Sequence, residues 1–87
     1  MTESTKHLRN QWQALRDELS NKVWRHTVLG DEIPELRRKG EVEKVLANRI
    51  DMRLLEIEIR DGKKLARKLM KEIKELEMKE QRIRFDD

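Results

Sequence analysis

Seven basic side chains between positions 60 and 74 are the residues of this sequence best placed to bind a ligand. They are Arg60, Lys63, Lys64, Arg67, Lys68, Lys71 and Lys74, and we call them the basic row. Starting at Arg60, five of the seven recur at steps of four, three, four and three residues, which places them on one face of an α-helix. Such a row can contact successive phosphates of DNA or RNA without reading the bases. It can equally be a solvated helix surface, which is the role of most charge runs.

The other polar residues form no pattern typical of catalysis or metal binding. Cysteine is absent, and His7 and His26 lie nineteen positions apart without a clustered carboxylate partner. The sequence has no glycine-rich phosphate loop and no nucleophile with a placed base. We therefore predict a protein that is not an enzyme, binds no metal or other cofactor, and has no small-molecule substrate.

Composition favours long helices over a compact globule. Charged residues make up 45% of the 87 residues and aromatic residues only 3%, a usage typical of coiled coils. Hydrophobic residues recur at helical spacing, so we do not expect disorder. A chain of this length forms one domain, residues 1–87, and buries only about 60% of its unfolded surface, which favours oligomerisation.

Targeting and membrane signals are absent from the sequence. Residues 1–10 lack the apolar core of a signal peptide, and no apolar run approaches the roughly 20 residues that cross a bilayer. We predict a cytoplasmic protein that does not enter a membrane.

Three helices are expected: residues 5–29, a short reversal helix over 32–39, and a long helix over 41–84. The first carries an apolar stripe from Leu8 to His26 and is predicted to end at Gly30. Pro34 and neighbouring acids open the short helix, and bases before Gly40 close it. The expected fold is an all-α helical hairpin with coiled-coil character.

The long helix has more apolar surface than the first helix can cover. At about 43 residues it would measure roughly 65 Å, against about 37 Å for the first helix. Its middle part carries two stripes on roughly opposite faces, and one further stripe follows Gly62. One middle stripe comprises Val42, Leu46, Ile50, Leu54 and Ile57. We assign the other stripes to a homodimer interface, namely Val45, Met52, Leu55, Ile59, Leu65, Leu69, Ile73, Leu76 and Ile83.

Asp61 and Gly62 leave two architectures open. A turn there would produce a three-helix bundle, whereas a continuous helix would pair with another subunit. A helix starting at Gly62 would place Lys63 and Lys64 against the positive end of its dipole, so we prefer the continuous helix.

A second predicted contact with another protein lies near the chain reversal. Trp24 and Val28 fall outside the Leu8 stripe, and Ile33 and Leu36 are the only apolar residues of the short helix. Exposed tryptophans often anchor interfaces, which makes this group a candidate docking patch. The alternative is that the four side chains pack together and finish the hairpin.

The function predicted from these features is protein binding without catalysis. The protein would be an adaptor, assembly factor or inhibitor that acts as a homodimer and binds another protein. An accessory protein of a virus or mobile element fits this description. The alternative is a protein that binds nucleic acid independently of sequence through the basic row.

Overall fold

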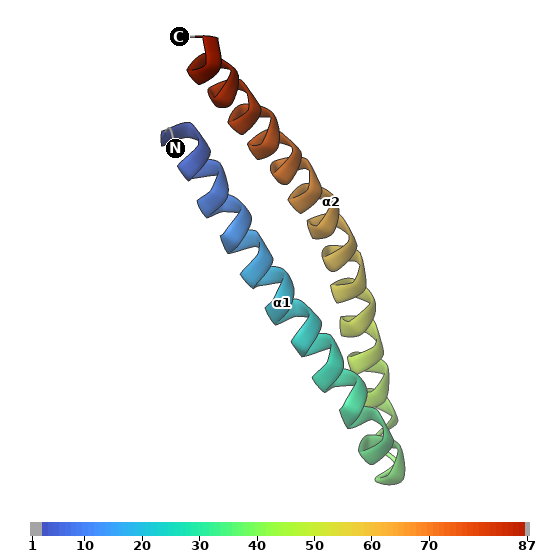
Figure 1. Ribbon diagram of the computed structural model, residues 1–87. Helices are drawn as coiled ribbons and strands as arrows, with labels where there is room; N and C mark the ends of the chain where they lie inside the picture. The colour runs from blue at the N-terminus through green and yellow to red at the C-terminus, as the bar shows by residue number, and fades with distance from the viewer. Residues whose placement is uncertain (1–2, 87) are drawn as a thin grey trace.

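Two long antiparallel helices make up the structure, which is a computed structural model (Figure 1). It describes the backbone of residues 3–86 and the side chains of residues 5–81. Helix α1 spans Glu3–Arg38 and helix α2 spans Val42–Asp86. The hairpin measures 71 × 15 × 14 Å, and its radius of gyration is 19.9 Å. A compact chain of this length would have a radius of about 12 Å, so the molecule is a rod with little interior.

One row of residues from each helix forms the contact between them, at alternating steps of three and four residues. All of these residues are buried or half-buried, and we call them the seam. On α1 they are Thr5, Leu8, Trp12, Leu15, Leu19, Lys22, His26, Leu29, Ile33 and Leu36. On α2 they are Val45, Asn48, Met52, Leu55, Ile59, Gly62, Ala66, Leu69, Ile73 and Leu76. This is the seven-residue repeat of a coiled coil, which keeps the same stripe of each helix against its neighbour.

Contacts along the seam fix the alignment of the two helices. Leu19 packs on Gly62 near the middle of the rod. Closer to the turn, the Asn48 side-chain amide donates to the Leu29 carbonyl at 3.1 Å. At the open end, the Thr5 hydroxyl donates to a Glu80 carboxylate oxygen at 3.0 Å. Helix α1 therefore lies along α2 as far as Glu80.

Gly40 makes the reversal between the helices possible. Its φ of +73° is a left-handed conformation that a side chain would strain. The Gly40 and Glu41 amides donate to the carbonyls of Arg37 and Leu36, at 3.1 and 3.0 Å, which satisfies the last acceptors of α1. The Glu41 carbonyl then accepts from Val45, and only three residues separate the end of α1 from the start of α2.

The prediction of a separate reversal helix is wrong, because α1 continues through Gly30 and Pro34 to Arg38. Pro34 lacks an amide, so the hydrogen bond to the Gly30 carbonyl is lost, and its ring crowds that carbonyl. Packing outweighs that loss, since His26, Leu29, Ile33 and Leu36 continue the seam without interruption. Helix α1 thus has 36 residues rather than about 25 and covers α2 as far as Glu80, so the uncovered end of the long helix is shorter than expected.

The predicted continuous long helix is confirmed, and the alternative of a three-helix bundle is wrong. Helix α2 runs through Asp61 and Gly62 without a break. Gly62 lies in the seam, and its missing side chain leaves the space that Leu19 fills. The glycine therefore serves close packing and not a turn.

Candidate protein-interaction face

The side of α2 turned away from α1 carries an exposed apolar stripe. We call it the outer stripe, and it consists of Val42, Leu46, Ile50, Leu54 and Ile57. These side chains remain 39–65% exposed. Isolated exposed hydrophobic residues are normal, but a contiguous group on one helix face marks an interaction surface. The exposed apolar residues of this extended hairpin therefore indicate that it has a partner.

The residues predicted for a homodimer lie mostly in the seam. Val45, Leu55 and Ile73 are the buried hydrophobic residues of the described chain. Met52, Ile59, Leu69 and Leu76 are half-buried beside them, whereas Leu65 is exposed, and the side chain of Ile83 is outside the described residues. In the hairpin the seam residues face α1, whereas the outer stripe stays exposed.

Periodicity correctly showed two apolar stripes on the middle of α2 but did not show which one faces α1. The signal that decides this is present in the first helix. Leu29, Ile33 and Leu36 extend the Leu8 stripe by the same steps of three and four. The matching row on α2 is equally long and begins at Val45. The small residues Gly62 and Ala66 interrupt its apolar pattern, so the row is hard to recognise in the sequence.

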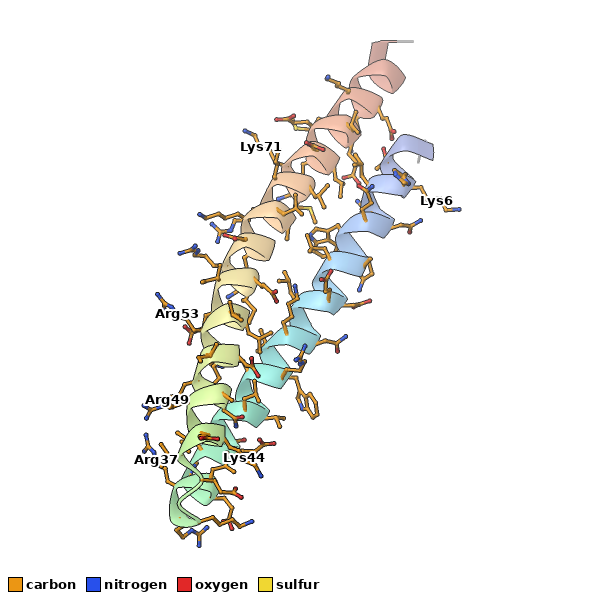
Figure 2. The ribbon with its side chains drawn as sticks, turned by 180° about the vertical axis from the view of Figure 1, so that it is seen from behind. Lys6, Arg37, Lys44, Arg49, Arg53 and Lys71 are labelled. Carbon is orange, nitrogen blue, oxygen red and sulfur yellow. The ribbon has the colours of Figure 1, made fainter. Side chains whose placement is uncertain are left out.

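The basic row lies on the same outer side of α2 as the outer stripe, nearer the open end of the hairpin. Figure 2 shows Arg49, Arg53 and Lys71 projecting from α2 on the side away from α1. Arg60 lies 3.6 Å from the Asp61 carboxylate. Among the side chains that the structure describes, the other six members of the row form no ion pair. The outer side of α2 thus carries the outer stripe, flanked by Arg49 and Arg53, near the turn and the basic row from Arg60 onward.

The four residues predicted as a docking patch do not come together. Ile33 and Leu36 are half-buried in the seam. Trp24 is 68% exposed on the outer side of α1, and Val28 is half-buried one turn further along. Seam residues therefore close the turn end of the hairpin. Trp24 lies on the outer surface of α1, whereas the outer stripe lies on α2.

Ionic contacts across the seam are exposed and local. His26 Nε2 lies 3.0 Å from Glu56 Oε1, and this hydrogen bond lowers the pKa of the Glu56 carboxyl. Lys22 lies between Glu18 and Glu58, at 3.1 and 3.5 Å, and chiefly the hydrogen bond to Glu18 raises the pKa of Lys22. Exposed pairs of this kind add little stability and instead favour one alignment of the helices.

The described residues offer no group of three or more histidine, cysteine, aspartate or glutamate side chains that could hold a metal ion. The hollows on the rod are shallow. One, at the turn end of the outer stripe, is lined by Arg37, Val42, Val45, Leu46 and Arg49. Neither described helix has a stretch apolar and long enough to span a membrane.

The chain matches no known family model, no curated protein and no solved structure.

Proposed function

We propose that the protein is a non-enzymatic interaction module that associates with itself and binds a larger protein complex as an adaptor, assembly factor or inhibitor. The outer stripe of α2 is the observation that carries this proposal. Helix α1 already covers the inner side of α2, so the intramolecular fold gives the outer stripe no neighbour. Burying it requires another molecule.

The driving force for association is hydrophobic and modest. Fully burying a leucine, isoleucine or valine side chain contributes about 1.5–3 kcal/mol, and the outer-stripe residues already hide about half of their surface in the helix. About 1 kcal/mol for each residue is therefore available in each copy. The loss of translational and rotational freedom consumes much of this sum, so association should be reversible.

Sedimentation velocity over a range of protein concentrations tests the proposal. Wild type should sediment above the monomer mass, and Ile50→Glu with Leu54→Glu should sediment as a monomer. A matched control places a glutamate on the outer side of α1, at Asn21, and should behave as wild type. Circular dichroism verifies that each variant stays helical. A wild type that is monomeric at every concentration would refute self-association.

A second candidate function is sequence-independent nucleic-acid binding through the basic row. It is favoured by the six bases from Lys63 to Lys74, which form no ion pair among the described side chains although Glu72 and Glu75 lie beside Lys71 and Lys74 in the sequence. Arg67, Lys71 and Lys74 also line one hollow, together with Met70, Glu75 and Met78. Titration with a generic DNA duplex at low salt should show binding that Arg67→Glu with Lys71→Glu removes and that added salt weakens steeply. No binding by wild type at low salt would eliminate this function.

A further inference from the structure

Four residues on the outer side of α2 repeat at intervals of seven: Glu43, Ile50, Ile57 and Lys64. All four are exposed. Seven residues are two turns of a supercoiled helix, so the four side chains lie nearly in line along about 32 Å of the rod. Glu43 and Lys64 have no ion-pair partner among the side chains that the structure describes.

This line of four residues is complementary in charge to the same line running in the opposite direction. In one direction it presents an acid, two isoleucines and a base, and a second copy running the opposite way presents a base, two isoleucines and an acid. We propose that two copies of the chain pair antiparallel through the outer faces of their α2 helices. Glu43 then meets Lys64 of the partner copy, and Ile50 packs on Ile57 of the partner copy. This inference rests on the proposed self-association and specifies its geometry.

Charge distinguishes this pairing from the parallel one. A parallel pair would place Glu43 beside the second Glu43, and both basic rows would lie against each other along their whole length. Like charges directly opposed across an interface disfavour association. The antiparallel pair instead separates the two basic rows and sets an unpaired acid beside an unpaired base at each end of the contact.

Leu54 supplies the apolar contact nearest the centre of the arrangement. It lies between Ile50 and Ile57 along the helix and is 55% exposed in the single hairpin. An antiparallel two-fold axis that pairs Ile50 with Ile57 passes between Arg53 and Leu54. The two copies of Leu54 meet on one side of the axis, and the two copies of Arg53, each paired with its own Glu56, lie on the other side. The resulting assembly has the two α2 helices inside and the two α1 helices outside.

The same geometry leaves most of the basic row accessible. In this pairing Arg67 and Lys71 would lie opposite positions of the partner copy numbered below 42. Those positions precede the start of the partner copy's α2 at Val42. Each basic row therefore extends past the turn of the other copy, at opposite ends of the assembly. Self-association uses Lys64 of the basic row, whereas Arg67, Lys68, Lys71 and Lys74 stay available to an anion, so the two functions are compatible.

Cysteine cross-linking tests orientation directly, because the natural chain contains no cysteine. Glu43→Cys and Lys64→Cys are prepared as separate proteins, oxidised alone and as a mixture, and analysed by non-reducing electrophoresis. We expect a disulfide-linked dimer in the mixture and little in either protein alone. Asn21→Cys on α1 is the control and should not cross-link with either variant.

Charge reversal tests the same contact without oxidation. Glu43→Lys and Lys64→Glu should each weaken the dimer roughly tenfold, because two symmetry-related ion pairs become repulsive in each case. The double variant should regain wild-type association in sedimentation velocity. A parallel pair would instead give no such rescue.

Each other outcome overturns the inference in a distinct way. Disulfides within Glu43→Cys alone and within Lys64→Cys alone would show a parallel pair. A dimer in sedimentation without the mixed cross-link would show that another register or surface is used, and would leave the proposed self-association intact. A monomer throughout would refute self-association itself and leave the outer stripe to a different protein.

Discussion

Gly62 provides the most direct test of how the two helices pack. A methyl group at this position would lie 2.4 Å from Leu19 Cδ2, 3.3 Å from Cγ and 3.6 Å from Cδ1. Gly62→Ala also removes a glycine from a helix interior, which by itself stabilises by about 1 kcal/mol. Overpacking a fitted contact costs about 1–3 kcal/mol. We expect the second effect to prevail and the variant to lose about 1 kcal/mol of unfolding free energy.

The sign should reverse when Leu19 is shortened. Leu19→Ala alone should cost about 2 kcal/mol, the lower end for leucine truncation, because Leu19 is only half-buried. With that side chain gone the methyl at position 62 meets no obstacle, and Gly62→Ala should then stabilise by about 1 kcal/mol. The two substitutions are therefore coupled by about 2 kcal/mol, as expected for residues in contact.

Thermal and urea unfolding followed by circular dichroism measure these differences at one fixed protein concentration. For a chain of this length 1 kcal/mol corresponds to a shift of about 4–8 °C in Tm. Gly30→Ala is the matched control: its methyl would lie 3.3 Å from the flexible end of Met52, which can move, so this variant should be stabilised. If Gly62→Ala stabilises as much as Gly30→Ala, with no coupling to Leu19, the alignment of the two helices is wrong.

Three further measurements follow from the same structure. Gly40→Ala should lower the unfolding free energy by about 1 kcal/mol through left-handed strain, seen as a lower urea midpoint with unchanged slope. Asn48→Ala should cost about 1 kcal/mol, because the bridge to Leu29 is lost; equal stability would show that this bridge contributes nothing. The lowered pKa of Glu56 favours folding above the ordinary value of 4.5, and that contribution disappears as pH falls through the lowered value. Glu56→Gln should therefore lose less stability than wild type on acidification below pH 4.5, and identical pH profiles would contradict this.

Local signals alone misplaced the boundary of the first helix. Gly30 followed by acids and Pro34 is a typical helix end, yet the seam carries α1 past both residues. A glycine ends a helix when no packing contact stabilises the residues beyond it. Here contacts with α2 stabilise α1 beyond Gly30. At Gly40 the same signal was reliable, because no further seam residue follows in the direction of α1.

The sequence by itself determined that the chain is helical, that it forms a hairpin, that a helix ends before Gly40, and that the middle of α2 carries two apolar stripes. These properties follow from periodicity and backbone preference, which act within a few residues. Only the tertiary structure decided that the Val45 side faces α1 and the Ile50 side faces outward. That choice depends on the alignment of the two helices. Contacts at Gly62 and Asn48 fix this alignment, and no pattern within α2 alone indicates it.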